Sequence, residues 1–285
     1  MSLGLALAGG GLKGIAHIGA LKALKDLDIK IDYLSGTSSG ALIGTIYALG
    51  YDTDEILKRF LSYYKEMTKI PKKPLVKAGV TYLSSGIAKI EGLIPGENIG
   101  NIIKECAREK KIKNMNEISI PYAIATVDTI STKECIFLSR KYDLKNENID
   151  YLYDAPVDIA TRASIAFPAV FTPCEYKGYN FIDGGTKDNL PIHILKDMGA
   201  TKTLGLSFKI DEYKPEPNLF AILLRAVDIF SLKDVRKAQA EADLAIEIDA
   251  AGTSLLEVDD VDKVFKIGYD TIMNNKEKIL KLIEK

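Results

Sequence analysis

The alternation of short apolar stretches with helical segments at the start of this chain restricts its fold more than any other feature of the sequence. Residues 3–8 form an apolar stretch of strand length, and residues 12–27 have a helical pattern. A second predicted strand at 31–35 and a second helix at 41–49, which Gly50 closes, repeat the alternation. Consecutive parallel strands need a crossover helix between them, and that crossover is right-handed. The sequence therefore predicts an α/β protein built on a parallel sheet.

The rest of the chain continues with elements of both kinds. Residues 53–116 are predicted to be helical and are rich in lysine. The elements predicted after residue 120 are strands at 122–127, 134–138, 203–207 and 244–248, a hairpin over 174–181, and helices at about 156–163, from Pro191, around 218–241 and from about 260 to the end. No linker or internal repeat interrupts the 285 residues, of which 47% are hydrophobic, so we predict a single domain over 1–285.

Composition argues against several classes of protein. The formal net charge of −1 provides no overall attraction to nucleic acid, which we do not expect as a partner. The three cysteines, Cys106, Cys135 and Cys174, are odd in number and lack metal-binding spacing, a pattern that favours reduced thiols. The sequence shows no signal peptide and no apolar run near the ~18 residues of a membrane span. We therefore predict a cytoplasmic protein.

The glycine-rich stretch after the first predicted strand fits two different anion-binding sites. Its letters, GGGLKG, match the dinucleotide fingerprint and stand for Gly9, Gly10, Gly11, Leu12, Lys13 and Gly14. In a dinucleotide-binding unit, an acidic residue at the carboxyl end of the second strand holds the ribose. Asp32 stands instead at the start of that strand, which disfavours a nucleotide. Bare N–H groups at the start of a helix also suit the oxyanion of an acyl-transfer intermediate.

A second motif lies where the second predicted strand meets the second helix. It reads G-x-S-x-G and consists of Gly36, Thr37, Ser38, Ser39 and Gly40. A strand, a turn and a helix with glycines two residues on either side of a serine form a nucleophile elbow, from which the serine projects. Because consecutive parallel strands end at the same edge of a sheet, we expect the two motifs to lie together. Ser38 is then the candidate nucleophile, and the GGGLKG stretch is its candidate oxyanion loop.

A serine nucleophile needs a base, and the sequence offers three candidates. His17 has apolar neighbours in the first helix and is interpreted as a packed helix residue. His193 reproduces the Ser, Asp, His order of α/β-hydrolases, but only one strand precedes the serine motif here, whereas several do in that fold. Asp183 ends an apolar strand before Gly184 and Gly185, and a carboxylate buried beside a hydroxyl becomes a usable base near neutral pH. The alternative interpretation of Asp183 is an ordinary turn aspartate.

The motifs GGGLKG, GTSSG and DGG, in this order, resemble those of the patatin-like phospholipases. The stretch ATRASIAFPAVFTPCEYKGYNFIDGGTKDNLPI also resembles this family. The resemblance covers a motif-bearing core of about 3–210 and, less specifically, a helical C-terminal part, 211–285. It implies a three-layer α/β/α sandwich with a mainly parallel central sheet, and a Ser–Asp dyad that hydrolyses lipid acyl esters without histidine, metal or organic cofactor. The implied roles are nucleophile for Ser38, base for Asp183 and oxyanion hole for the N–H groups of Gly10, Gly11 and Leu12.

Other outcomes stay open at this level. The same motifs would serve an acyltransferase or a thioesterase, whereas a non-catalytic lipid-binding protein would be expected to lose Ser38 or Asp183. Two segments could meet a lipid surface: 58–77, which interleaves basic and aromatic side chains, and 218–232, which is apolar almost all round. A solvated helix and a buried helix are their respective structural interpretations. The motifs do not encode the substrate head group or the oligomeric state.

Overall fold

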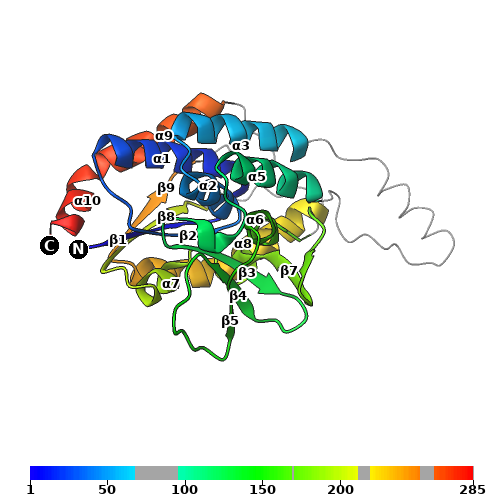
Figure 1. The fold of residues 1–285 in the computed structure, drawn as a ribbon. Coiled ribbons are helices and arrows are strands. Elements are labelled where there is room, and N and C mark those ends of the chain that lie inside the picture. The colour runs from blue at the N-terminus through cyan, green and yellow to red at the C-terminus, as the bar shows by residue number, and fades with distance from the viewer. Residues whose placement is uncertain (68–95, 169, 211–218, 251–259, 285) are drawn as a thin grey trace.

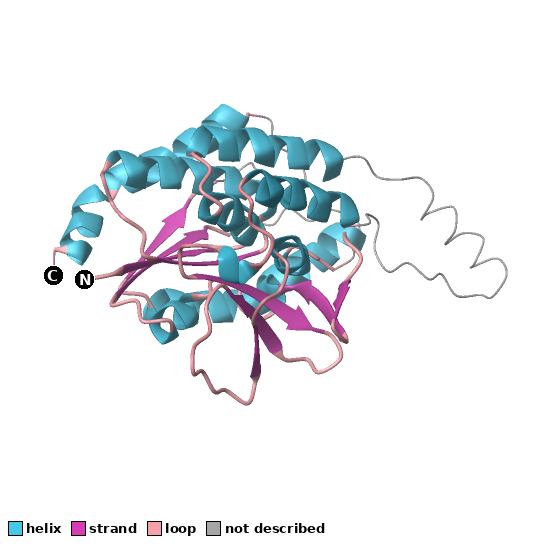
Figure 2. Ribbon diagram, viewed as in Figure 1, coloured by secondary structure: helices cyan, strands magenta, loops and turns pink. Residues whose placement is uncertain are grey.

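The computed structural model describes residues 1–67, 96–168, 170–210, 219–250 and 260–284. In these parts of the chain a sheet lies between two layers of helices (Figure 1, Figure 2). The helices of the larger layer are α1 (Gly14–Asp26), α2 (Ser39–Ala48), α3 (Thr53–Met67), α5 (Glu97–Glu109), α6 (Val157–Ser164), α9 (Val261–Asn274) and α10 (Lys276–Ile283). The opposite face carries α7 (Ile192–Asp197) and α8 (Leu219–Glu241). The predicted three-layer α/β/α fold is therefore confirmed.

Nine strands form the sheet within the described residues. They are β1 (Leu3–Leu7), β2 (Tyr33–Thr37), β3 (Tyr122–Asp128), β4 (Glu134–Leu138), β5 (Ile149–Leu152), β6 (Cys174–Tyr176), β7 (Tyr179–Asp183), β8 (Lys202–Phe208) and β9 (Leu244–Ile248). Seven follow the order β5-β4-β3-β2-β1-β8-β9, and β7 pairs with β3 and β6. The neighbours from β3 to β9 along this order are all parallel, whereas β4 and β7 run antiparallel to β3. The prediction of a mainly parallel sheet is thus confirmed.

β1 lies inside the sheet and is buried along its whole length. Leu5 and Leu7 belong to the apolar cluster of the larger helix layer, and Ala6 and Ala8 belong to the cluster that contains α7. A parallel strand covered by helices on both faces is apolar throughout instead of alternating with polar residues. This explains why the first strand can be recognised as an unbroken apolar stretch.

β7 enters the sheet beyond the end of β2. Thr37, the last residue of β2, pairs with Ala125 of β3, and Asp183, the last residue of β7, pairs with Thr126 of the same strand. Because β4 occupies the other edge of β3, β2 and β7 share one edge and meet end to end. This arrangement brings Asp183 next to Ser38, which follows β2 directly.

The described elements agree with the sequence predictions to within two residues at most ends. The strand β5 was missed, because it has four residues at the edge of the sheet and only Ile149 is buried. The hairpin predicted over 174–181 extends to Asp183. The C-terminal strand β9 joins the same sheet through β8, which favours the single-domain interpretation. That interpretation stays a prediction.

Burial bears on the alternatives left open for the two candidate lipid-facing segments. Phe60 in α3 is 1% exposed, so this aromatic residue belongs to the core and is unable to face a membrane. Residues 68–77 of the same segment lie outside the described residues. In α8 the buried-helix interpretation is wrong at Ile229 and Phe230, whose exposed fractions are 58% and 72%. No helix in the described part of the chain combines the length and apolar character needed to cross a bilayer.

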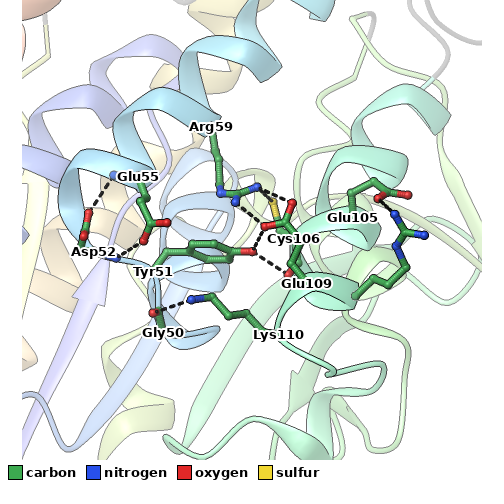
Figure 3. Close-up of polar contacts among 10 residues, drawn as sticks. Gly50, Tyr51, Asp52, Glu55, Arg59, Glu105, Cys106, Glu109 and Lys110 are labelled. Carbon is green, nitrogen blue, oxygen red and sulfur yellow. Dashed lines mark hydrogen bonds and ion pairs between the residues drawn. The ribbon is translucent and has the colours of Figure 1, made fainter.

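A polar cluster joins the loop after α2 to α5 (Figure 3). Tyr51 is 4% exposed, and its hydroxyl lies 2.9 Å from the carbonyl oxygen of Cys106 and 2.8 Å from a carboxylate oxygen of Glu109. The guanidinium group of Arg59, from α3, pairs with the same carboxylate. Arg59 and Lys110 each place their cationic group 4.0 Å from the centre of the Tyr51 ring. This cluster therefore fastens α3 and α5 to each other through Tyr51.

Candidate active site

Ser38 occupies a strained turn between β2 and α2. Its backbone has φ 53° and ψ −122°, a region that side chains disfavour, and its side chain is half-buried. In the first turn of α2, a Cβ at Gly40 would lie 2.2 Å from the carbonyl oxygen of Leu7 in β1. Glycine is therefore required for the helix to pack this close to the strand. The turn places Ser38 at the N-terminal end of α2, where free N–H groups favour negative charge.

Two hydroxyl groups fix this turn to its neighbours. The N–H of Ser38 donates to Ser164 Oγ at 2.9 Å, and the Ser164 hydroxyl donates to the carbonyl oxygen of Ala125 at 2.7 Å. The hydroxyl of Thr37 donates to the carbonyl oxygen of Asp188 at 2.8 Å. Ser164 belongs to none of the three motifs GGGLKG, GTSSG and DGG. No local pattern marks its role, because the contact joins residues 126 positions apart.

Asp183 is held firmly in the turn after β7. The residue is 1% exposed, its Oδ1 accepts the N–H of Gly185 at 2.8 Å, and its own N–H donates to the carbonyl oxygen of Ala166 at 3.0 Å. A Cβ at Gly184 would lie 2.4 Å from the carbonyl oxygen of Ala125, so only glycine allows this approach to β3. Within the described residues, Oδ2 of Asp183 has no hydrogen-bonding partner. One carboxylate oxygen is thus fixed and the other is left for a proton.

The environment of Asp183 favours its neutral form. Burial raises the pKa of this carboxyl to about 7, and the Ser38 hydroxyl and the Gly185 N–H offset part of the rise. Ser38 is therefore close enough to affect the carboxyl, although no well-formed hydrogen bond joins the two side chains. Such bonds are often long before substrate is bound. A carboxyl group with this pKa can exchange a proton at neutral pH.

The glycine-rich loop lies against the same turn. A Cβ at Gly9 would lie 2.9 Å from the Cβ of Ser38. After this point the chain enters the 3₁₀ helix η1 (Gly11–Lys13), which continues into α1. The N–H groups of Gly10, Gly11 and Leu12 make no hydrogen bond within the described part of the chain. Free N–H groups beside a hydroxyl are what an oxyanion requires.

The remaining residues of these motifs pack the loops together. A Cβ at Gly14 would lie 3.1 Å from the Cβ of Ser39, which is itself buried. The ammonium group of Lys13 donates to the carbonyl oxygen of Lys209 at 3.5 Å, just beyond β8. Both motifs are thereby in contact with each other, as the sequence predicts from their place after neighbouring strands.

His17 lies under the glycine-rich loop and not beside the Ser38 hydroxyl. Its ring is fully buried, packs at 4.4 Å against Phe208, and its Nε2 lies 2.9 Å from the carbonyl oxygen of Ala8. Because a carbonyl oxygen only accepts, Nε2 carries the proton and donates it. Burial lowers the pKa of His17 to about 4, and the bond to Ala8 offsets only part of this effect. The neutral ring belongs to a packed helix residue, as its apolar neighbours in the sequence predict.

His193 is surrounded by carboxylates. Its Nε2 lies 3.1 Å from Oδ2 of Asp188 and 3.3 Å from Oε1 of Glu134, and its Nδ1 lies 3.8 Å from Asp197. Burial by itself lowers the pKa of His193, but the hydrogen bonds to Asp188 and Glu134 outweigh it and raise the pKa to about 11. The ring is then a cation at neutral pH and is unable to accept a proton. One ligand atom from each of Glu134, Asp188 and His193 lies within 4.8 Å of the others, a spacing that could also hold a metal ion.

Asp32 lies at the amino-terminal ends of the strands, whereas both loops lie at their carboxyl ends. Its carboxylate accepts the N–H of Leu3, the first residue of β1, and pairs with Lys30. Ligands of parallel α/β sheets bind at the carboxyl ends of the strands. Asp32 therefore does not occupy the position that binds the ribose in a dinucleotide site.

The sequence matches the profile of a known family. The sequence profile described as "Patatin-like phospholipase" matches residues 5–196. This match covers more than half of the chain, and the chain belongs to this family.

The chain is also similar to particular proteins. It is 29% identical over 221 residues to an uncharacterized NTE family protein of Mycobacterium tuberculosis, covering 76% of this chain and 53% of that protein. It is 26% identical over 215 residues to the lysophospholipase NTE1 of Yarrowia lipolytica, covering 75% of this chain and 13% of that protein. The chain thus spans about half the length of the mycobacterial relative. Among solved structures, VipD from Legionella pneumophila has a TM-score of 0.52 with 16% identity, covering 96% of this chain and 66% of VipD, which is a likeness of fold.

Proposed function

We propose that this protein is a lipid acyl hydrolase that cleaves carboxylic esters through an acyl-serine intermediate on Ser38. The observation that carries the proposal is the contact between a serine on a strained turn and a buried aspartate, Asp183, whose pKa is raised to about 7. Membership of the patatin-like phospholipase family supports an ester of a lipid as the substrate. His193 is not required, because its carboxylate partners keep it protonated.

In the first step the substrate acylates the serine. Oδ2 of Asp183 accepts the hydroxyl proton of Ser38 while Oγ attacks the ester carbonyl carbon. The carbonyl oxygen gains a negative charge, which the N–H groups of Gly10, Gly11 and Leu12 stabilise. When the tetrahedral intermediate collapses, the ester bond to the alcohol breaks. The leaving alcohol takes the proton from Asp183, and the acyl group stays on Ser38.

In the second step water removes the acyl group. Asp183, again ionised, accepts a proton from a water molecule that attacks the acyl-serine carbonyl carbon. The same N–H groups stabilise the second oxyanion. Collapse breaks the bond to Oγ of Ser38, which recovers its proton from Asp183, and a fatty acid leaves. The chemistry uses only side chains and backbone groups of this chain.

The relatives indicate the alcohol part of the substrate better than the site does. The site residues described above contact the reacting carbonyl group, so they do not select a head group. The similarity to the lysophospholipase of Yarrowia lipolytica supports a phospholipid or lysophospholipid. A substrate of this kind is held at a lipid surface, which also supports peripheral contact with a membrane.

The first test combines fatty-acid release with covalent labelling. The purified protein should release fatty acid from labelled lysophospholipid or from a p-nitrophenyl ester, and a fluorophosphonate probe should label it on Ser38. Ser38→Ala should abolish both signals. Ser131→Ala, which changes an exposed serine in the turn after β3, is the matched control and should keep both.

Two results would contradict the proposal. Labelling that persists in Ser38→Ala would place the nucleophile elsewhere. Transfer of the acyl group to an added alcohol or thiol in preference to water would favour the acyltransferase function that shares this site.

A further inference from the structure

Asn189 holds the oxyanion loop from the side of the base loop. Its Oδ1 accepts the N–H of Gly9 at 3.0 Å, and its Nδ2 lies 3.4 Å from the carbonyl oxygen of Gly9, to which it donates. The backbone carbonyl oxygen of Asn189 lies 3.3 Å from the same N–H. One residue, 180 positions further along the chain, therefore binds both polar groups of Gly9.

These bonds orient the first N–H group of the candidate oxyanion hole. The carbonyl group of Gly9 and the N–H of Gly10 belong to the same peptide unit. A trans peptide is planar, and its C=O and N–H bonds point in opposite directions. A side chain that holds the carbonyl group of Gly9 thus also fixes the direction of the Gly10 N–H. In Asn189 the Nδ2 group of the carboxamide is the donor that holds the Gly9 carbonyl group.

The same carboxamide borders the base and the nucleophile. A Cβ at Gly185 would lie 3.0 Å from Oδ1 of Asn189 and 3.1 Å from Oδ1 of Asp183. A Cβ at Gly9 would lie 2.5 Å from Oδ1 of Asn189 and 2.9 Å from the Cβ of Ser38. Asn189 therefore sits at the point where the three loops converge. Its side chain is neutral, so it adds no charge beside a carboxyl that must lose and regain a proton.

The residue before it ties the segment to the remaining loop. The carbonyl oxygen of Asp188 accepts the Thr37 hydroxyl at 2.8 Å, and its N–H donates to the carbonyl oxygen of Gly184 at 2.8 Å. Asp188 and Asn189 together contact the ends of β1, β2 and β7. A displacement of Asn189 would accordingly change the spacing between the oxyanion loop and Ser38.

We infer that Asn189 is a positioning residue that sets the oxyanion loop relative to Ser38 and Asp183. The inference rests on the proposed function, since an oxyanion hole matters only if an oxyanion forms. Asn189 itself does not touch the reacting atoms. Its loss should therefore cost less than the 10²–10³-fold that removal of one oxyanion donor costs, and we expect about 10- to 100-fold in kcat.

The test compares Asn189→Ala with the wild type on a p-nitrophenyl ester. We expect kcat to fall about 10- to 100-fold while KM changes less than about twofold, because the ground state makes no use of the hole. Ser38 Oγ adds to the carbonyl carbon of a trifluoromethyl ketone analogue, and the adduct carries the same kind of oxyanion as the reaction intermediate. Its affinity should fall by the same factor as kcat/KM. A non-reacting methylene analogue of the ester should bind as before.

A second variant and a control accompany this comparison. Asn189→Asp keeps the volume and the acceptor for Gly9, but replaces the donor by an oxygen that repels the Gly9 carbonyl group. It should be impaired in kcat and in ketone affinity even if Asn189→Ala does not fold. Asn180→Ala is the matched control, because it removes a carboxamide on β7 whose side chain bonds to Thr129 and to no other residue in the described part of the chain. We expect it to keep wild-type kcat.

Hydrogen exchange separates this inference from the proposed function. Amides in the peptide covering residues 5–14 should exchange faster in Asn189→Ala than in the wild type, whether or not the protein hydrolyses the chosen ester. If the wild type hydrolyses no ester but exchange still rises, the proposed function fails and the positioning role stands. The inference would be overturned if the folded Asn189 variants kept the kcat, the ketone affinity and the amide exchange of the wild type. A lower kcat with unchanged ketone affinity would overturn it as well.

Discussion

Asp183 carries a carboxyl group in a place that suits its neutral form better than its charged form. Burial raises its pKa from the ordinary 3.8 to about 7. At about 1.4 kcal/mol per pKa unit, the ionised form costs the folded protein roughly 4 kcal/mol. This cost is complete above pH 7 and shrinks as the pH falls from 7 to 3.8, because in that range only the folded protein takes up the proton. The residue that the proposed chemistry needs is thus unfavourable for stability.

Asp183→Asn should therefore change activity and stability in opposite directions. The amide keeps the shape of the side chain but does not accept a proton, so we expect kcat to fall by about 10²–10⁴-fold. The same change removes the buried charge, so the urea midpoint should rise most at pH 8 and rise less at pH 5, where the folded carboxyl is already protonated. Activity assays and urea unfolding at the two pH values test this prediction.

The pH profile of the wild type provides the control for this assignment. Since Asp183 must be ionised to act as a base, kcat/KM should rise with pH through about 7 and then level off. The rising limb should persist in His193→Gln, which should keep most of the activity. If His193→Gln is folded and as inactive as Ser38→Ala, Asp183 is not the base.

At the scale of elements, Tyr51 joins helices α3 and α5 of the larger layer. Tyr51→Phe removes the hydroxyl that bonds to Cys106 and Glu109 but keeps the ring between Arg59 and Lys110 (Figure 3). We expect the free energy of unfolding to fall by about 1–2 kcal/mol, because the buried carbonyl and the carboxylate lose a partner. Urea unfolding measures this change.

Tyr47→Phe is the matched control for that measurement. Tyr47 lies in α2 four residues before Tyr51, and no described residue forms a hydrogen bond with its hydroxyl. Its loss should change the free energy of unfolding by less than about 0.5 kcal/mol. Equal effects of the two substitutions would mean that the cluster does not hold α3 and α5 together.

At the scale of the whole molecule, three groups with large pKa shifts contribute to the pH dependence of stability. His17, with its pKa lowered to about 4, makes the protein less stable as the pH falls from 6.5 to 4, because only the unfolded chain binds that proton. Asp183 acts in the opposite direction over nearly the same range, because only the folded protein binds its proton. His193, with its pKa raised to about 11, contributes stability that is complete below pH 6.5 and is lost as the pH rises toward 11.

The sum of these groups predicts an asymmetric stability profile. We expect little change in the urea midpoint between pH 4.5 and 6.5, where His17 and Asp183 cancel, and a steady fall above pH 7. Each uncompensated proton contributes at most about 1.4 kcal/mol per pH unit. In His193→Gln the alkaline fall should flatten, and in Asp183→Asn an acid fall should appear. A symmetric profile that neither substitution alters would contradict these pKa shifts.

Local patterns in the sequence were sufficient to predict much of this protein. The apolar stretch of β1, the helices that follow β1 and β2, and the motifs GGGLKG and GTSSG all depend on residues within one turn or one strand of each other. Such patterns respond to backbone geometry, which neighbouring residues determine. The rule that parallel strands end at one edge then predicted that both loops meet. Because of this rule, the candidate nucleophile could be identified without a structure.

Contacts between distant parts of the chain were decided only by the tertiary structure. Ser164 bonds to Ser38 across 126 positions and Asn189 to Gly9 across 180, and no local pattern predicts either contact. The pKa of Asp183 depends on its burial, which arises because β7 pairs with β3 beyond the end of β2. Hydrogen bonds and desolvation act through space and not along the chain. For this reason the sequence could propose a base, while only the packing of β7 shows why this carboxyl titrates near neutral pH.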